Sequence, residues 1–526
     1  MWRMSLFTRA AATLAATAVV LVPGTVGAAH ADDAVPLPSA DNWYTTDAGN
    51  LADYAHGAVI ASRPVTATVS DLQHALAKPP TTLPSMSATQ VLYRTRNATG
   101  GRSETVTTVL QPSGASKGVV AYLSYYDGLS DVCDPSYTLQ DPEVNASTLP
   151  EKAIIGTLLE QGYTVTIPDF EGETLDWAAG HEAGWSTLDA VKATEAQLNL
   201  PTTTKVGMIG YSGGSIAGEW GSELAPSYAP DLNIVGTAIG GVPVNLAHVM
   251  NYVDSSADKD RDQWAGVIPA AMVSLARAYG DDFSDYLSST GEADTAAVSS
   301  QCIQAFAGNY PGLHVADLLK PGVNFLNEPD VKQIVSGLVM GNGDTPKAPM
   351  LMVQGNEDGI GDGVMVAADV KALATKYCNA GLPVQYNEVP GEAHGDVGTS
   401  FMLQGMTYLA QRFAGGTAQN NCAALTAKPK PAPTPAPPTA IHAKLKGHSK
   451  GKKDVLVVTA KDAIGAKVQL FRAGHKKAIG HGTIRKNGKV TIKVEDRNGS
   501  AKTRYHATVA ATATTQAAKT KVLRLR

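Results

Sequence analysis

The sequence predicts an α/β fold with a mostly parallel central sheet and a helical insertion, followed by a small all-β domain. Three observations lead to this prediction. Apolar runs of strand length alternate with helical patterns over most of the chain, a Pro-rich segment occupies residues 427–440, and short alternating apolar and polar runs follow it. Strands that are separated by helices favour a parallel sheet with helices on both faces.

The expected elements of the α/β part follow one another along the chain. Strands are expected at 119–124, 163–168, 205–209, 233–239 and 349–354, with helices at 151–161, 188–198 and after residue 214. Residues 244–347 form an insertion that the sheet does not need, and it carries apolar helical patterns. We expect this insertion to be a cap over an apolar pocket. The alternative is a helical subdomain without a gating role.

The first 31 residues have the pattern of a secretory signal peptide. Arg3 and Arg9 accompany an apolar stretch at 10–22, and the sequence AHA at 29–31 offers a cleavage site between small residues. A membrane anchor is the alternative, but the stretch is shorter than the roughly 20 residues that a spanning helix needs. We therefore expect a secreted, extracellular protein that begins at Asp32.

The four cysteines fit an oxidising compartment, where an even number can pair as disulfides. They are Cys133, Cys302, Cys378 and Cys422, which allow three pairings. A zinc site is the alternative, but no two of them have the close spacing of a metal cluster. We expect neither a metal nor a cofactor.

The near-neutral total charge hides two strongly charged parts. Residues 428–526 carry 23 Lys and Arg against 4 Asp and Glu, a net charge of +19. The residues before them carry 20 basic and 44 acidic side chains, a net charge of −24. The Pro-rich segment at 427–440 favours an extended spacer between an α/β domain at 32–426 and a basic domain at 441–526.

The basic domain has short strand patterns that predict an immunoglobulin-like β-sandwich, at 455–460, 466–471, 489–494 and 505–511. Its charge suits an anionic cell-wall polymer or an anionic lipid surface, and the alternative is an accessory domain without a ligand. Nucleic acid is not expected, because the protein is expected to be exported and aromatic side chains are sparse. We expect a monomer.

The sequence GYSGG at 210–214 has the form of a nucleophile elbow. An apolar run precedes it and a helical pattern follows, so a strand enters the turn and a helix leaves it. The flanking glycines let the chain reverse sharply and present the Ser212 hydroxyl for attack on a carbonyl. Ser212 is the candidate nucleophile, and the N–H of Gly213 is the first candidate donor of an oxyanion hole.

An elbow of this kind is followed along the chain by its acid and then by its histidine. The expected acid is Asp358, which lies three residues past Gly355 in the loop after the strand at 349–354. The competing carboxylates are Glu357, Asp362 and Asp396. All four could instead be solvated loop charges or a calcium-like cluster.

The histidine follows from chain order. His394 is the one histidine between Asp358 and the Pro-rich segment, and it lies in a glycine-containing loop after a strand pattern. It is the expected general base, and a surface histidine is the alternative. For the second oxyanion donor we expect Asp127, in the loop after the strand at 119–124, although an ordinary turn aspartate fits that position as well.

These motifs resemble the secretory lipase family, a group of α/β-hydrolases that includes the yeast type A lipase. The resemblance spans about 36–422 and rests on YYD at 125–127, CDPSY at 133–137, GYSGG at 210–214, GGVP at 240–243, GNED at 355–358 and GEAHG at 391–395. Two features depart from the family. Glu357 adds a second carboxylate beside the acid, and the basic domain lies outside the shared region.

The resemblance implies a role for each candidate residue. Ser212, Asp358 and His394 would form a catalytic triad, and Asp127 with Gly213 would form the oxyanion hole. The cysteines would pair as Cys133 with Cys302 and Cys378 with Cys422.

The expected function is that of a secreted lipase or carboxylesterase that hydrolyses acylglycerol esters through an acyl-serine intermediate. One alternative is a serine peptidase or an acyltransferase with the same residues, since the elbow does not define the leaving group. The other is a surface-binding protein whose α/β domain is inert.

Overall fold

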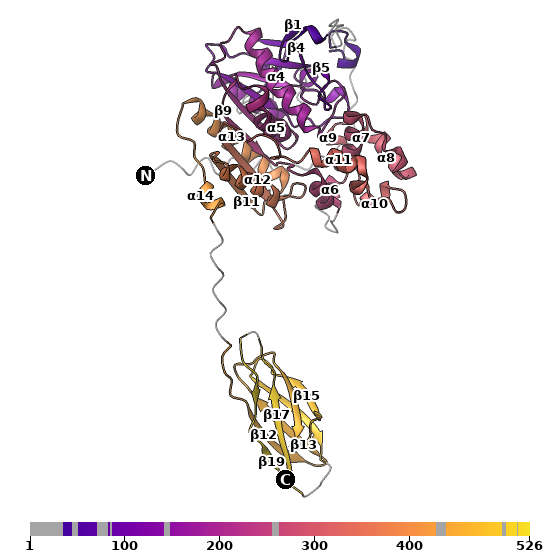
Figure 1. Cartoon of the computed structure of the whole chain (residues 1–526), viewed down its shortest axis with the longest axis vertical. Helices are drawn as coiled ribbons and strands as arrows, with labels where there is room; N and C mark the ends of the chain where they lie inside the picture. The colour runs from indigo at the N-terminus through magenta and orange to yellow at the C-terminus, as the bar shows by residue number, and fades with distance from the viewer. Residues whose placement is uncertain are drawn as a thin grey trace. The chain divides into compact units, whose positions relative to one another are not determined.

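The structure is a computed structural model that describes residues 35–44, 51–70, 83–84, 87–140, 148–254, 262–427, 438–496, 501–512 and 514–526. The expected signal peptide at 1–31 and most of the Pro-rich segment lie outside these ranges. The chain divides into two compact units, Met1–Ala427 and Lys428–Arg526. They are called the body and the basic domain below (Figure 1).

A nine-stranded mixed sheet forms the centre of the body, with its strands in the order β1-β4-β5-β7-β6-β8-β9-β10-β11. The pairings from β7 to β11 are parallel, and those from β1 to β7 are antiparallel. The strands are β1 Val59–Val65, β4 Ala88–Arg96, β5 Arg102–Leu110, β6 Val119–Leu123, β7 Thr164–Pro168, β8 Lys205–Tyr211, β9 Asn233–Gly240, β10 Met350–Asn356 and β11 Val384–Pro390. The parallel part confirms the sequence prediction, whereas β1, β4 and β5 are additional to it.

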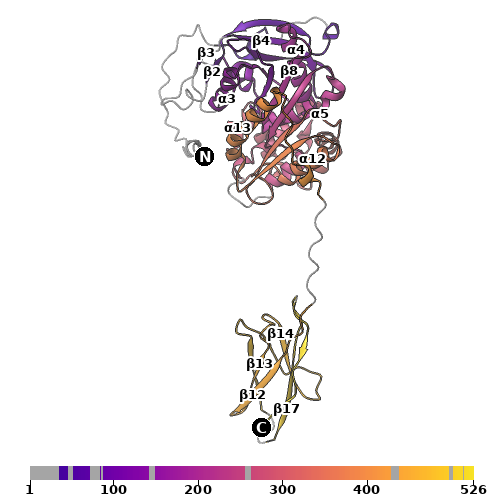
Figure 2. The ribbon, with the colours of Figure 1, turned by 90° about the vertical axis from the view of Figure 1, so that its left-hand side faces the viewer.

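Helices cover both faces of this sheet, because successive side chains of each parallel strand enter opposite cores. Ala121 and Leu123 of β6 belong to one core, and Val120 and Tyr122 to the other. The first core is shared with α4 Gly180–Gln197, α5 Gly213–Tyr228 and α12 Ala367–Asn379. The second is shared with α3 Leu149–Glu160 and α13 His394–Phe413, and Figure 2 shows the two groups on either side of the strands.

Smaller elements complete the sheet region of the body. They are β2 Thr68–Val69, β3 Leu83–Pro84, α2 Pro135–Thr138, α14 Cys422–Leu425, and the 3-10 helices η2 Pro38–Ala40, η3 Leu51–Asp53 and η4 Asp131–Cys133. None of the helices in the described part of the chain is long and apolar enough to cross a membrane.

The helical insertion lies between β9 and β10 and is called the cap. It contains α6 Leu246–Asp254, η5 Asp262–Trp264, α7 Val267–Tyr279, η6 Phe283–Asp285, α8 Ser289–Val298, α9 Ile303–Phe306, α10 Val315–Leu318, η7 Phe325–Asn327 and α11 Pro329–Gly337, which gather at one side of the body (Figure 1). These helices share a hydrophobic core with Leu129, Val364 and Met365. Since those three residues follow β6 and β10, the cap packs on loops at the carboxyl ends of the parallel strands.

The basic domain consists of two antiparallel sheets around one core. Its strands are β12 Lys444–Lys450, β13 Lys453–Thr459, β14 Lys467–Arg472, β15 Gly480–Thr483, β16 Lys489–Glu495, β17 Thr503–Val509, β18 Ala518–Lys519 and β19 Leu523–Leu525. One sheet has the order β12-β13-β16, and the other contains β15-β14-β17 with β18 and β19. Leu456 of the first sheet and Leu470 of the second belong to the same core, as a sandwich requires. The immunoglobulin-like classification stays a prediction.

Candidate active site

Ser212 lies in a sharp turn between β8 and α5. Its φ and ψ angles are +55° and −123°, a combination that a non-glycine residue adopts only under strain. The turn is tight because a side chain at Gly210 would meet the carbonyl oxygen of Gly214 at 2.2 Å, and one at Gly214 would meet that of Leu123 at 2.1 Å. Two glycines are therefore needed for the chain to reverse and to present the Ser212 hydroxyl.

His394 is the first residue of α13, which follows β11 at the edge of the sheet. From there its side chain reaches Ser212. Its Nε2 lies 2.8 Å from Ser212 Oγ, and its side chain is buried. The Tyr211 hydroxyl donates to the His394 carbonyl, and the Tyr211 ring lies against the imidazole. The structure therefore brings together Ser212 and His394, the two residues that the sequence predicts to interact.

The other imidazole nitrogen faces a buried aspartate. His394 Nδ1 lies 2.9 Å from Asp362 Oδ2, and the backbone N–H of His394 donates to the Asp362 carbonyl at 2.8 Å. Asp362 Oδ1 accepts from the N–H groups of Val364 and Met365 at 3.2 and 2.7 Å. Such bonds fix the carboxylate and, through it, the orientation and tautomer of the imidazole.

The expectation that Asp358 is the partner of His394 is wrong, because Asp362 occupies that place. Asp358 is exposed on the loop after β10, where its Oδ1 accepts from the N–H groups of Ile360 and Gly361 at 2.7 and 3.0 Å. Its side chain therefore closes a turn, as aspartates often do. After this turn the chain reverses direction, and Asp362 comes to lie beside the His394 imidazole.

The buried side chain of Gln354, in β10, braces Asp362. Gln354 Nε2 donates to Asp362 Oδ2 at 2.8 Å, and its Oε1 accepts from the N–H of Val242 at 3.2 Å. Gln354 is not among the site residues expected from the sequence. Its signal is an amide within an otherwise apolar strand, which is unusual enough to require a partner.

Asp127 lies beside the elbow, in the loop after β6. It is buried, with a φ angle of +37°. Its carboxyl group lies so close to Gly213 that a side chain at that position would meet Oδ1 at 1.5 Å. The two residues expected to form the oxyanion hole are thus in direct contact.

Burial sets the protonation of Asp127. Its pKa is raised to about 7, because desolvation disfavours the carboxylate; the bond from Trp177, the nearby His394 and the Gly213 N–H oppose the rise. Trp177 Nε1 donates to Asp127 Oδ1 at 2.8 Å. Near neutral pH the carboxyl group is therefore divided between its neutral and ionised forms.

Two glutamates hold the rest of this loop, of which Glu151 is half-buried and Glu171 is buried. Glu151 of α3 accepts from the Ser124 hydroxyl at 3.1 Å and from the Tyr125 N–H at 3.2 Å. Glu171 accepts from the Gly128 N–H at 3.0 Å. Because these partners are distant in sequence, the sequence pattern contains no signal for them.

The loop is also joined to the cap. Cys133 is disulfide-bonded to Cys302, and the Leu129 N–H donates to the Gln301 carbonyl at 2.9 Å. Trp177 extends the connection, since the cap residue Ser274 donates to its carbonyl. The second disulfide joins Cys378 to Cys422 at α12 and α14. Both pairs are those that the family resemblance implies.

The cap also reaches the histidine. The indole of Trp264, in η5, meets the His394 ring edge to face with 5.2 Å between centroids. The Trp264 Nε1 atom is buried and has no hydrogen-bond partner among the described residues. A cap side chain thus forms part of the wall around the base.

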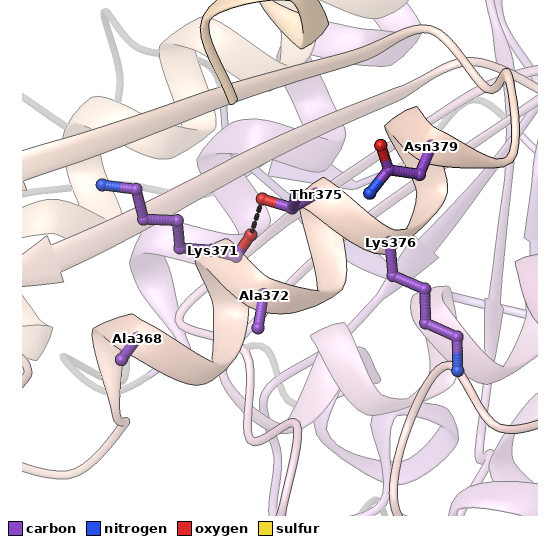
Figure 3. Close-up of a pocket in the computed structure, with 6 residues that line it drawn as sticks. All are labelled: Ala368, Lys371, Ala372, Thr375, Lys376 and Asn379. Atoms are coloured by element: carbon purple, nitrogen blue, oxygen red, sulfur yellow. Dashed lines mark hydrogen bonds between the residues drawn. The ribbon is translucent and has the colours of Figure 1, made fainter. Parts of the chain in front are cut away.

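One surface hollow lies apart from these residues. An open hollow on α12 is lined by Ala368, Lys371, Ala372, Thr375, Lys376 and Asn379 (Figure 3). None of these residues belongs to the group formed by Ser212, His394 and Asp362, so the hollow is separate from it. Within the described ranges, no group of three or more His, Cys, Asp or Glu side chains could hold a metal ion.

The order of strands, the elbow and the cap define the body as an α/β-hydrolase. The chain belongs to the secretory lipase family, whose profile matches residues 141–421. A secreted triacylglycerol lipase of Malassezia globosa is 31% identical over 439 residues, which are 80% of this chain and 89% of that protein.

Two further likenesses bear on the fold and the activity. The crystal structure of Candida antarctica lipase A is similar with a TM-score of 0.65 and 27% identity, covering 74% of this chain and 89% of that one. A Mycobacterium tuberculosis protein named as a probable inactive lipase is 30% identical over 399 residues, 72% of this chain and 83% of its own. Membership of the family therefore does not by itself establish activity.

Proposed function

We propose that this protein is a secreted serine carboxylic-ester hydrolase that acts on acylglycerols. The observation that carries the proposal is the continuous hydrogen-bonded series from Ser212 Oγ through both nitrogens of His394 to Asp362. A serine, an imidazole and a buried carboxylate in this order activate the hydroxyl as a nucleophile.

In the acylation step, Ser212 Oγ attacks the ester carbonyl carbon and gives its proton to His394 Nε2. Asp362 stabilises the imidazolium that forms. The tetrahedral intermediate then collapses, the bond to the alcohol oxygen breaks, and His394 returns the proton to the departing alcohol. The acyl group remains as an ester of Ser212.

Deacylation repeats this chemistry with water. His394 takes a proton from a water molecule, whose oxygen attacks the acyl carbon. The second tetrahedral intermediate releases Ser212 Oγ, which recovers its proton from the imidazolium. The products are an alcohol and a carboxylic acid.

The oxyanion of each intermediate needs a donor, and Gly213 N–H lies directly after the nucleophile. An ionised Asp127 would repel this oxyanion and retain the Gly213 N–H for itself. The neutral carboxyl group can instead donate its own O–H. The pKa of Asp127, raised to about 7 by burial, supports a role for the neutral form.

Two observations favour an acyl substrate. Relatives such as the Malassezia globosa protein are named as triacylglycerol lipases, and the cap places the half-buried, largely apolar indole of Trp264 against the base. Burial of an acyl chain against such side chains contributes about 0.8 kcal/mol for each CH₂ group.

The Ser212→Ala variant tests the proposal. We expect it to fold normally and to lose turnover of both an emulsified long-chain triacylglycerol and a soluble short-chain ester by about a thousandfold or more. Undiminished activity in the variant would refute the proposal. A wild-type preference for the soluble ester would assign an esterase, and turnover of a matched amide would assign a peptidase.

The likeness to a probable inactive lipase favours one alternative, a binding protein with an inert body. Complete lack of turnover by the wild-type chain would support it. Secretion is part of the proposal, because relatives are named as secreted and the first 31 residues have a signal-peptide pattern. Terminal sequencing of the exported protein should find Asp32 first.

A further inference from the structure

One face of the basic domain is lined with lysines. In the sheet β12-β13-β16, alternate residues enter the core and the others face solvent. The outward residues are Lys444, Lys446, His448 and Lys450 of β12, Lys453, Val455, Val457 and Thr459 of β13, and Lys489, Thr491, Lys493 and Glu495 of β16. This set is called the lysine face below.

The register of the strands fixes the arrangement of this face. Lys446 lies opposite Val457, which lies opposite Thr491. In the next row, Val455 lies between His448 and Lys493. Lysines on the two outer strands thus flank a strip of half-buried aliphatic side chains, and their methylene stems can cover that strip while the ammonium groups stay in water.

The charge of this face is not neutralised within the domain. It contains six lysines and one carboxylate, Glu495. None of the ion pairs among the described residues involves these six lysines. Six ammonium groups on a surface three strands wide, about 10 Å across, attract an anionic partner.

We propose that the lysine face docks on an anionic lipid surface. The match is one of charge and shape, since a twisted but open sheet presents its cations as a broad array. Polybasic surfaces bind anionic membranes with about 1 kcal/mol for each lysine near the surface, which is about fivefold in the binding constant.

The chemistry of the face disfavours a polymer of sugars or nucleotides. Such ligands are commonly held by aromatic rings that stack on them, and none of the twelve outward residues is Trp, Tyr or Phe. Half-buried Val455 and Val457 beside lysine stems suit the boundary between headgroups and acyl chains better.

Docking on lipid would also keep the body close to its substrate. This consequence rests on the proposed function. Residues 1–427 carry a net charge of −24, so an anionic surface repels the body. Hydrolysis of acylglycerols releases fatty acids and makes a substrate surface progressively more anionic. A tethered domain with a net charge of +19 would retain the enzyme there.

The test uses the full chain with Ser212→Ala, so that no hydrolysis alters the lipid. Binding is measured by co-sedimentation with vesicles of phosphatidylcholine, alone or with about 30% phosphatidylglycerol. We expect binding only to the mixed vesicles, and weaker binding as salt is raised. The result does not depend on turnover, so it can fail or succeed independently of the proposed enzyme activity.

A charge-matched pair of variants locates the surface. The first replaces Lys444, Lys446, Lys489 and Lys493 by Gln, and the second replaces Lys467, Arg504, Lys519 and Arg524 by Gln on the outward side of the other sheet. We expect the first to weaken binding about a hundredfold or more and the second to weaken it far less. Circular dichroism checks that both fold.

Three outcomes would overturn the proposal. Equal losses in the two variants would mean that net charge, and not the lysine face, drives binding. No preference for the anionic vesicles would exclude anionic lipid as the partner. Undiminished binding of the first variant to vesicles, with loss of its binding to a soluble anionic wall polymer, would assign the face to that polymer.

Discussion

His394 Nδ1 lies 2.9 Å from Oδ2 of Asp362, while Nε2 of the same ring lies 2.8 Å from Ser212 Oγ. The imidazole therefore bridges a buried carboxylate and the half-buried serine of the elbow. This contact identifies Asp362, rather than one of the neighbouring acidic residues, as the partner of His394. Each member of the site can therefore be tested by substitution.

The choice of acid is tested by two matched substitutions. Asp362→Asn should lower kcat for a soluble ester about a thousandfold, because the amide no longer stabilises the imidazolium and can favour the wrong tautomer. Asp358→Asn should leave kcat near the wild-type value, since Asp358 closes a surface turn. The opposite pattern of losses would restore Asp358 as the acid.

Gln354 is expected to act through Asp362. Replacing it by Leu removes the donor at 2.8 Å from Asp362 Oδ2 and should lower kcat about tenfold to a hundredfold with little change in KM, because the triad is misplaced while the substrate pocket is intact. Steady-state kinetics measures both constants. A change confined to KM would argue against a positioning role.

Ionisation of the Asp127 carboxyl group should make activity depend on pH. A carboxyl group whose pKa is about 7 loses its proton as pH rises through that value, so kcat should fall on the alkaline side. The variant Asp127→Asn cannot ionise and should lack the alkaline decline.

The same shift affects stability in a definite direction. Because folding raises the pKa of Asp127 from 3.8 to about 7, its contribution to stability is full below pH 3.8 and is lost as pH rises through about 7. The Tm of wild type should therefore decline from pH 5 to pH 8 more than that of Asp127→Asn. If kcat and Tm decline equally with rising pH in wild type and in Asp127→Asn, ionisation of Asp127 does not cause either decline.

The two disulfides should differ in their effect on activity. Replacing Cys133 and Cys302 by Ser releases the Asp127 loop from the cap, and should lower both Tm and kcat. Replacing Cys378 and Cys422 should lower Tm alone. Closure of 169 rather than 44 residues makes the first loss of stability larger by about 1 kcal/mol in the chain-entropy picture. Equal kcat values in both variants would show that the loop does not need this tether.

The sequence predicts the local features of this protein well. The parallel strands, the elbow at Ser212 and the choice of His394 depend on short patterns and on chain order, which the residues themselves carry. Asp362 is different, because its position depends on a turn that Asp358 closes with two backbone N–H groups. Spacing from Gly355 does not reveal that the chain doubles back there.

The residues that hold the catalytic side chains in place also cannot be predicted from local sequence patterns. Trp177 binds Asp127 across 50 positions of the chain, and Gln354 binds Val242 across 112. Such contacts follow from the packing of the sheet and the cap and not from any local pattern. The antiparallel strands β4 and β5 are not evident from the sequence, because Gln90, Thr107 and Thr108 are buried in them and obscure the expected alternation of apolar and polar residues.

Covalent labelling shows directly whether Ser212 is the nucleophile. The wild-type chain is incubated with a long-chain alkyl phosphonate ester, and its intact mass and peptides are analysed by mass spectrometry. A single phosphonyl adduct on Ser212, absent from Ser212→Ala and formed much more slowly in Asp362→Asn, is the predicted result. No adduct, or an adduct on another residue, would contradict the claim that Ser212 is the nucleophile.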